Sequence, residues 1–335
     1  MATIRDVASL SGVSVGTVSR YLNGIKIRDD NAQAIAKAIE KLDYYPSIFG
    51  RALTKQRSLA IGILVADTGN VFSSTIIGGL ESEFEERGYT SLFVDFHRDV
   101  EVLKEKARFL MSRKVEGLVV FLSEVDVSGL GFLGDLDIPV VVVDNPLESP
   151  RVDSVVVDNA TATEQVVLAM LDEGHRRVGV IAPDQRTYVG QTRLQGWKDA
   201  FAARGLSLQE EDIRVCGPSK LASYEAACSL LDAGHITALF TCNYYAALGA
   251  IKVLNERGLA PGADIGFASF DDFDFSDVMN PALTVVHQPM GEIVEHVARI
   301  MSDRLDRGEV AAGIHMLRSS VVLTDSIRGR GLSDG

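Results

Sequence analysis

The sequence has little of what a secreted, membrane-bound or metal-binding protein needs. Its three cysteines are odd in number and lack the spacing of a metal site, so we expect reduced thiols and no bound metal. No apolar run approaches the roughly 18–20 residues that cross a bilayer, which argues against a membrane partner. Met1 leads into a polar helical pattern without an apolar signal region, so we expect a cytoplasmic protein.

Groups for catalysis are also missing. The six histidines are scattered, and none forms a metal pair or a triad with a serine. The sequence has neither a glycine-rich motif that would hold phosphate nor paired catalytic side chains, so we expect no cofactor and no enzyme activity. What the chain does have is 46% apolar residues over 335 positions, enough for a small head and one or two larger domains.

The first residues predict a helix-turn-helix. Two short helical patterns occupy residues 3–23, joined by a Ser-Gly-Val turn in which Gly12 can take a left-handed conformation. Thr3 and Ser14 can cap the two helices, and a third apolar stripe follows over residues 32–42. This geometry is typical of proteins that bind the major groove, although a three-helix bundle with no nucleic-acid role would show the same pattern.

Charge favours DNA binding by this head. Residues 1–57 hold nine Lys and Arg against five Asp and Glu, a net charge of +4. The whole chain carries −13, so residues 58–335 carry −17. A basic head can contact phosphates, whereas an acidic body is repelled by them. We therefore expect the head to be the surface of the chain that contacts DNA.

Residues 3–53 resemble the head of the lac repressor family. The matching motifs are T-I-R-D-V-A at 3–8, G-V-S at 12–14, T-V-S-R at 17–20, L-N-G at 22–24 and G-R-A-L at 50–53. The resemblance implies that the residues binding double-stranded operator DNA are Thr3, Ser14, Val15, Gly16, Thr17, Ser19, Arg20, Asn23 and Leu53. Val15 can meet a thymine methyl group, and Arg20 can bind guanine with two hydrogen bonds. The family's Thr-Arg pair is replaced by Asp30-Asn31-Ala32, which removes an expected phosphate contact.

The segment 47–58 has two interpretations. It is either a plain linker or, as in the family, a hinge helix that folds on DNA and inserts a leucine into the minor groove. Leu53 matches that leucine, and an exposed leucine in a basic segment favours the hinge. We therefore predict a DNA-binding domain at 1–46 and a hinge at 47–58.

Residues 59–325 predict an α/β core. Nine apolar runs of strand length, from 60–65 to 283–287, alternate with amphipathic segments such as 76–87 and 290–305. Such alternation is typical of doubly wound parallel sheets with helices on both faces. About ten strands suggest two sheets rather than one.

The core also resembles that of the lac repressor family, through segments such as V-A-D-T-G-N at 65–70 and F-A-S-F-D-D at 267–272. The resemblance implies two lobes like those of periplasmic sugar-binding proteins, joined by three crossovers. It places an N-lobe at about 59–158 plus 289–318, a C-lobe at about 159–288 plus 319–325, and a polar tail at 326–335. A ligand cleft is implied at the carboxyl ends of the strands.

Five residues match the family's effector-binding positions: Phe72, Ser73, Arg193, Asn243 and Asp271. A carboxylate and a guanidinium facing one cleft suit hydroxyl groups, and Phe72 can pack on the apolar face of a sugar. Each of the three polar residues of the C-lobe could instead have a purely structural role. Asp271 can cap a turn, Asn243 can cap the next helix, and Arg193 can pair with a surface acid.

Three classes of function fit these features: a DNA-binding repressor controlled by a small effector, a regulator controlled by a protein partner, and a two-lobed sugar-binding protein or enzyme. The missing signal region and catalytic groups favour the first two. We predict a homodimer on a near-palindromic operator, with a sugar or sugar derivative in the cleft. The cleft wall departs from the family at 71–73 and at Tyr244, so the effector of no relative transfers to this chain. The tail lacks a leucine heptad, so we expect no tetramer.

Overall fold

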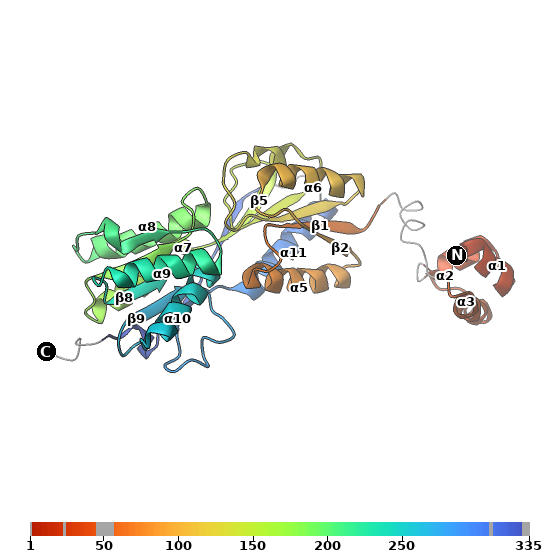
Figure 1. The fold of residues 1–335 in the computed structure, drawn as a ribbon. Coiled ribbons are helices and arrows are strands. Elements are labelled where there is room, and N and C mark those ends of the chain that lie inside the picture. Colours follow the sequence, from red (N-terminus) through yellow and green to blue (C-terminus); the bar gives the residue numbers. More distant parts are fainter. Residues whose placement is uncertain (1, 23–24, 45–56, 308–310, 330–335) are drawn as a thin grey trace. The chain divides into compact units, whose positions relative to one another are not determined.

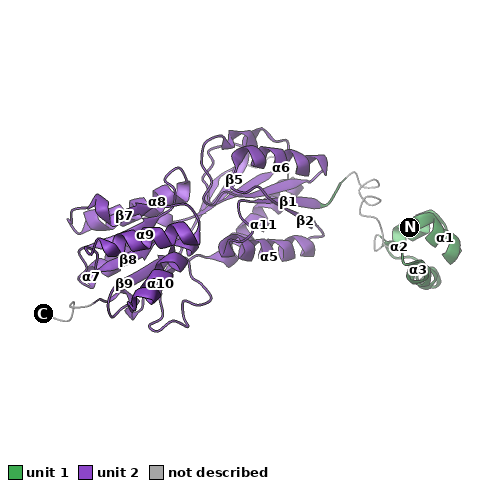
Figure 2. Cartoon of the chain, viewed as in Figure 1, with its two compact units in different colours: residues 1–59 green, residues 60–335 purple. Residues whose placement is uncertain are grey.

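The computed structural model of the chain describes every residue except 1, 23–24, 45–56, 308–310 and 330–335 (Figure 1). It divides into two compact units, residues 1–59 and 60–335 (Figure 2). Each unit has hydrophobic clusters of its own, because the apolar stripes of the helices and strands pack within the unit.

The first unit packs three helices around one small core. They are α1 (Ile4–Ser11), α2 (Val15–Leu22) and α3 (Asp29–Leu42). Val7, Val18 and Ile35 contribute one fully buried side chain from each helix. Gly12 ends α1 with a φ of 69°, a left-handed conformation that glycine adopts without a Cβ clash. The predicted helix-turn-helix is therefore present as α1, this turn and α2.

The second unit contains two six-stranded sheets. The first, which we call the N-lobe sheet, has the order β11-β5-β4-β3-β1-β2, with strands at Ala60–Val65 (β1), Thr90–Asp95 (β2), Gly117–Phe121 (β3), Val140–Val143 (β4), Val152–Val157 (β5) and Ile314–Leu317 (β11). The second, the C-lobe sheet, has the order β12-β10-β9-β8-β6-β7, with strands at Val178–Ala182 (β6), Ile213–Val215 (β7), Ala238–Thr241 (β8), Gly266–Phe270 (β9), Thr284–His287 (β10) and Ser320–Val322 (β12). Within the described strands the pairing is parallel, except that β12 runs antiparallel to β10.

Helices cover both faces of each sheet. In the N-lobe, α5 (Val71–Glu86) and α11 (Met290–Arg307) pack on one face and α6 (Val100–Ser112) on the other. In the C-lobe, α7 (Asn159–Asp172) and α8 (Tyr188–Ala203) cover one face, and α9 (Lys220–Asp232) and α10 (Tyr244–Arg257) cover the other. Short 3₁₀ helices lie at Leu130–Asp135, Glu210–Asp212 and Asp325–Ile327. Strands enclosed in this way are apolar on both faces. The predicted fold, a small helical head and two lobes of doubly wound parallel sheet, is confirmed.

Several elements begin or end away from the predicted positions. α5 begins at Val71 rather than at residue 76, because Asn70 Oδ1 accepts a hydrogen bond from Ser73 N at 3.3 Å and caps the helix. Thr187 and Ser219 cap α8 and α9 in the same way, and each helix starts about one turn earlier than its apolar stripe. The strands β7, β11 and β12 were not predicted, because they are short and lie at sheet edges.

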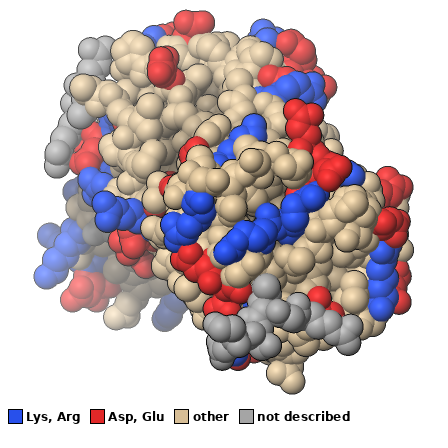
Figure 3. All heavy atoms as spheres, turned by 90° about the vertical axis from the view of Figure 1, so that its left-hand side faces the viewer, with Lys and Arg blue, Asp and Glu red and all other residues tan. Residues whose placement is uncertain are grey.

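Several arginines of the core form ion pairs with neighbouring acids. Arg177 pairs with Asp212 at 2.6 Å and with Glu211 at 2.7 Å, and Arg204 pairs with Asp172 at 2.8 Å. On the face that Figure 3 shows, basic and acidic side chains lie beside one another. Among the described residues, no helix has the length and apolar character that crossing a membrane requires.

Candidate functional site

The outer face of α2 carries the residues predicted to contact bases. Val15 and Ser19, and likewise Gly16 and Arg20, are four residues apart, so these four share one face of the helix. Val15 is 43% exposed, and Gly16 and Arg20 are also exposed, whereas Val18 on the other side is buried in the head core. A Cβ at Gly16 would meet only Ser14 Oγ, at 3.9 Å. The face is therefore exposed and uncrowded at Gly16, and a major groove admits a helix of this kind.

Hydrogen bonds at the helix ends orient this face. Thr3 N and Thr3 Oγ1 both donate to Asp6 Oδ2 at 2.7 Å, and Asp6 N donates back to Thr3 Oγ1 at 3.4 Å, which forms a capping box. Ser14 Oγ accepts from Thr17 N at 3.2 Å and caps α2. The predicted capping roles of Thr3 and Ser14 are therefore observed, while their DNA contacts stay predictions. Asn23 and Leu53 lie outside the described residues.

Polar side chains follow the strands of both lobes at their carboxyl ends. Those of the N-lobe are Asp67 after β1, Arg98 after β2, Glu124 after β3 and Asp144 after β4, and those of the C-lobe are Asn243, Asp271 and Gln288 after β8, β9 and β10. Arg98, Glu124, Asp144 and Asp271 have φ values of 60°, 59°, 65° and 84°. Such left-handed conformations cost a non-glycine residue about 1–3 kcal/mol and gather at binding sites.

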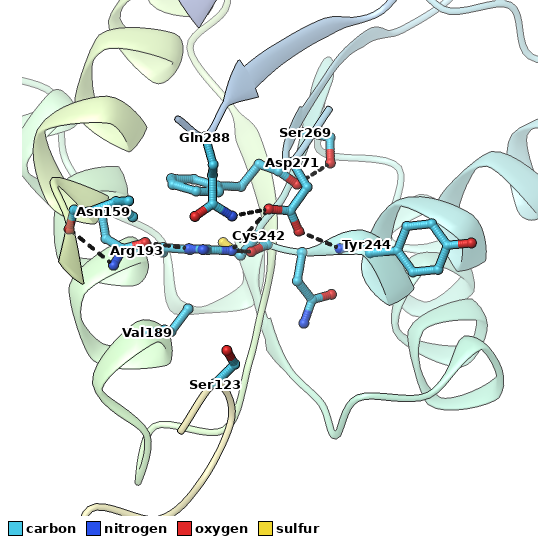
Figure 4. Close-up of polar contacts among 12 residues, drawn as sticks. Ser123, Asn159, Val189, Arg193, Cys242, Tyr244, Ser269, Asp271 and Gln288 are labelled. Atoms are coloured by element: carbon cyan, nitrogen blue, oxygen red, sulfur yellow. Dashed lines mark hydrogen bonds and ion pairs between the residues drawn. The ribbon is translucent and has the colours of Figure 1, made fainter. Parts of the chain in front are cut away.

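Arg193 lies at the centre of the C-lobe wall (Figure 4). It is 3% exposed, and its Nε donates to Asn159 Oδ1 at 2.8 Å while its Nη1 donates to the carbonyl oxygen of Cys242 at 2.6 Å. The guanidinium also stacks on Phe270, with the central carbon 3.5 Å from the ring centroid. These partners are buried, so Arg193 does not pair with a surface acid.

Asp271 stands beside Arg193 on the same wall. Its Oδ2 accepts from Tyr244 N at 3.0 Å, and its Oδ1 accepts from Gln288 Nε2 at 2.5 Å and lies 4.0 Å from Arg193 Nη1 (Figure 4). The side chain is 13% exposed. The structure thus brings Arg193 and Asp271 together, although they are far apart in the sequence. Their role in effector binding stays a prediction.

Asn243 serves two structural purposes. Its Oδ1 accepts from Ala246 N at 2.8 Å and caps α10. Its Nδ2 donates to Glu124 Oε1 of the N-lobe at 2.5 Å. The capping interpretation of the sequence therefore holds, and the same amide also joins the two lobes.

Sequence reasoning missed the N-lobe residues that meet this wall. Tyr245 Oη donates to Asp67 Oδ2 at 2.7 Å, and Arg98 Nη2 donates to the same oxygen at 2.5 Å. Arg98 Nη2 also lies 3.7 Å from Glu124 Oε2. The first turn of α10 is therefore held to the N-lobe at Glu124 and at Asp67. A usable signal existed in the sequence, since each missed N-lobe residue is the first charged side chain after a strand.

Three acids at the strand ends of the N-lobe, Asp67, Glu124 and Asp144, have pKa values shifted in different directions. Burial raises the pKa of Glu124 to about 7, against the opposing charges of Arg98 and Arg193. Burial also raises the pKa of Asp144, whose Oδ2 accepts from Ser123 Oγ at 2.5 Å. For Asp67, burial is outweighed by hydrogen bonds from Tyr245 and the Gly69 amide and by Arg98, so its pKa is lowered. Near neutral pH, the lowered pKa therefore keeps Asp67 ionised, while a pKa of about 7 divides Glu124 between its protonated and ionised forms.

Phe72 and Ser73 belong to the first turn of α5. Phe72 packs in the N-lobe core and, with Tyr244 and Asp271, lines a cavity of about 10 Å³, which is roughly one water molecule. Ser73 is buried, and its amide donates to the capping Asn70. The predicted pair thus meets the C-lobe wall through Phe72, and a cavity of this size is too small for a sugar.

The cysteines take no direct part in this chemistry. All three are free thiols, and burial raises the pKa of Cys242 to about 12, so that thiol stays protonated. Its backbone oxygen is what contacts Arg193. Over the described ranges, no group of three or more His, Cys, Asp or Glu side chains is arranged to hold a metal ion.

Two family descriptions match the chain. Residues 3–47 match bacterial regulatory proteins of the lacI family. Residues 58–311 match the periplasmic binding proteins and sugar binding domain of the LacI family. Together the matches include both the helix-turn-helix head and most of the two-lobed core.

Individual relatives agree with these matches. The chain is 28% identical to the HTH-type transcriptional repressor PurR of Aliivibrio fischeri over 337 residues, which cover 98% of this chain and 99% of that protein. It is similar to the solved structure of a transcriptional regulator CelR–cellobiose complex, with 25% identity, a TM-score of 0.73, and 97% of this chain and 100% of that chain covered. The lac repressor dimer bound to operator and the anti-inducer ONPF has the same fold, with 23% identity, a TM-score of 0.86, and 98% and 99% covered. These relatives are regulators rather than enzymes, as the sequence predicted for this chain.

Proposed function

The chain belongs to the LacI family of bacterial regulatory proteins, and we propose that it represses transcription by binding a near-palindromic operator as a homodimer under the control of a small effector. The observation that carries the proposal is the exposed face of α2, with Val15, Gly16 and Arg20, on a head of net charge +4. Since a bacterial operator lies in the cytoplasm, the proposal places the protein there.

Exposed apolar side chains on both lobes support the homodimer. Leu221 and Val278 of the C-lobe are 68% and 74% exposed, and Phe93 of the N-lobe is 46% exposed. A two-fold contact buries the same apolar surface on both copies and can set two heads in successive major grooves. Val278→Asp combined with Phe93→Asp should shift light scattering from dimer to monomer and weaken operator binding.

The polar cleft supports a hydroxyl-rich effector, a sugar or sugar derivative. Asp271 and Gln288 offer acceptors and Arg193 offers donors on one wall. CelR, a relative, is named as a complex with cellobiose. Arg193→Ala or Asp271→Ala should each weaken effector binding by about 1–3 kcal/mol, because a buried polar partner loses its hydrogen bond. Binding of the operator by a protein that responds to no small molecule would instead favour control by a protein partner.

Selection of genomic DNA fragments by the purified protein tests operator binding. Arg20→Ala should cost about 1–3 kcal/mol and relax the preference at one base pair in each half-site. Lys37→Ala, which removes an exposed cation on α3, is the matched control and should weaken all fragments alike. An unchanged base preference in Arg20→Ala would refute base reading by α2.

A further inference from the structure

The two lobes contact each other directly at the start of α10. Asn243 Nδ2 donates to Glu124 Oε1 at 2.5 Å, and Tyr245 Oη donates to Asp67 Oδ2 at 2.7 Å. Arg98 Nη2 donates to the same Asp67 oxygen and lies 3.7 Å from Glu124 Oε2. The guanidinium of Arg98 thus holds both N-lobe acceptors in place for the two C-lobe donors.

The loop that follows β3, residues 123–128, contacts the C-lobe at a second place. Val127 N donates to the carbonyl oxygen of Arg186 at 3.2 Å, and Asp126 and Thr187 form one antiparallel backbone bridge. Asp126 Oδ2 also lies 3.7 Å from Arg186 Nη1. These contacts lie just before α8, and α8 and α10 cover opposite faces of the C-lobe sheet. The loop therefore reaches the C-lobe on both sides of its sheet.

The contacts between the lobes occupy buried positions. The Glu124 side chain is 7% exposed, and hydrogen bonds that are shielded from water in this way are strengthened. Glu124 and Arg98 have φ values of 59° and 60°. Such conformations persist only where the surrounding contacts enforce them. Where Phe72 meets Tyr244, the remaining cavity measures about 10 Å³. The chain's own side chains therefore fill this part of the cleft.

We propose that the core closes on itself without a ligand, with residues 123–128 as the latch, and that an effector enters only after the latch opens. The inference rests on the proposed function, because it concerns the control of the proposed effector cleft. A ligand that needs the open state binds with an affinity lowered by the fraction of molecules that are open. The latch therefore sets the effector concentration at which the regulator responds.

Hydrogen exchange in the free, full-length protein, resolved to single amides by mass spectrometry, tests the latch. The Val127 amide is the reporter, because its hydrogen-bond acceptor belongs to Arg186 of the other lobe. Without effector or operator, we expect Val127 to exchange at least about tenfold more slowly than an unprotected amide. Exchange at the unprotected rate would mean that the lobes stand apart in solution, and the proposal would be overturned. Because neither effector nor DNA is present, this result is distinct from a failure of operator binding, which selection of DNA fragments measures.

A double variant tests whether the two contact places form one latch. Asn243→Ser with Tyr245→Phe removes the bonds to Glu124 and Asp67 and leaves the residues around Val127 unchanged. Serine still caps α10 but lacks the amide that reaches Glu124, and phenylalanine keeps the ring. We expect Val127 to exchange about tenfold faster in this variant, because opening at α10 frees the same loop.

The control variant is Tyr224→Phe, which removes a phenol hydrogen bond to Glu256 inside the C-lobe and should leave Val127 at the parental rate. The amides of β6, in the middle of the C-lobe sheet, report whether each variant stays folded. If β6 loses protection in the double variant, Tyr245→Phe alone provides the test and should still speed exchange at Val127. Equal rates at Val127 in the folded latch variant and in the control would overturn the proposal.

Discussion

Glu124 is a carboxylic acid held out of water between two lobes, and its ionisation is coupled to their contact. Its pKa rises from the ordinary 4.5 to about 7, chiefly through burial. The folded core therefore holds a proton that the unfolded chain releases. The resulting stability is fully present below pH 4.5 and is lost as the pH rises through about 7.

Glu124→Gln should remove this pH dependence. Because glutamine stays neutral, the variant should gain stability relative to the parent as the pH rises from 5 to 8, by at most about 3 kcal/mol. Urea unfolding of the core transition across this range measures the difference. Glu105→Gln, at an exposed position of α6, should track the parent at every pH. Parallel curves for Glu124→Gln and the parent would contradict the buried, proton-holding state.

At the scale of elements, Asn243 both caps the first turn of α10 and links the C-lobe to the N-lobe through Glu124. Asn243→Ala removes the cap of α10 and the hydrogen bond to Glu124, whereas Ser219→Ala removes only the equivalent cap of α9. Each lost cap should cost about 0.5–2 kcal/mol. The loss of the hydrogen bond to the buried Glu124 should add about 1–3 kcal/mol to the first variant alone. Equal destabilisation of the two variants in urea would mean that the interlobe contact contributes nothing.

Helices α7 and α8 approach closely at Gly196. A Cβ there would lie 2.2 Å from Ala160 O and 2.9 Å from Thr163 Cβ, so Gly196→Ala should force the helices apart and cost about 1–3 kcal/mol. Gly78 of α5 is the control, since a Cβ there meets no atom within 4 Å. Gly78→Ala should instead stabilise the protein by about 0.5–1 kcal/mol, because glycine is a poor helix former. Calorimetric melting of the two variants should therefore show shifts of opposite sign.

Elements enclosed by helices were the most predictable from sequence. Val140–Val143 and Val178–Ala182 have the predicted bounds, because a strand covered on both faces is a continuous apolar run. The start of α5 was wrong, because Asn70, a polar residue before the apolar stripe, decides where the helix begins. Edge strands such as Ile213–Val215 were missed because three residues give no periodicity.

The C-lobe side of the candidate cleft was more predictable than the N-lobe side, where only Phe72 of the predicted residues lines the cavity. Arg193, Asn243 and Asp271 stand at positions that match a family motif, and the structure does bring them to one wall. Asp67 belongs to the matching segment at 65–70 but was not assigned to the cleft, and Glu124, which lies in no quoted motif, meets Asn243 across 119 positions of sequence. No spacing rule relates two residues that meet only because two separate sheets present their carboxyl edges to each other.

For the whole molecule, the uneven distribution of charge should make operator binding strongly dependent on salt. The head carries +4 and the remainder −17, so binding releases counterions while the acidic core repels the duplex. If two heads make about six to ten phosphate contacts, affinity should fall by about 10³–10⁵ between 50 and 200 mM salt. Fluorescence anisotropy on a selected operator measures the slope. Lys252→Gln, in the core, should leave the slope unchanged, and an affinity insensitive to salt would contradict binding by the basic head.

The chain crosses between the two lobes three times, and these crossovers set the order in which the lobes are completed during synthesis on the ribosome. The head is complete once residues 1–59 have emerged, but the N-lobe must wait for α11 and β11, which end at Leu317. Until then the apolar side of α5, including Ile76 and Leu80, lacks the Ile293 and Val297 that pack in the same cluster. Translation therefore completes the helix-turn-helix head long before it completes the two-lobed core. A frameshift shortly after residue 288 would leave the head attached to an N-lobe that lacks α11. We expect proteases to degrade such a product, because the apolar side of α5 would be exposed.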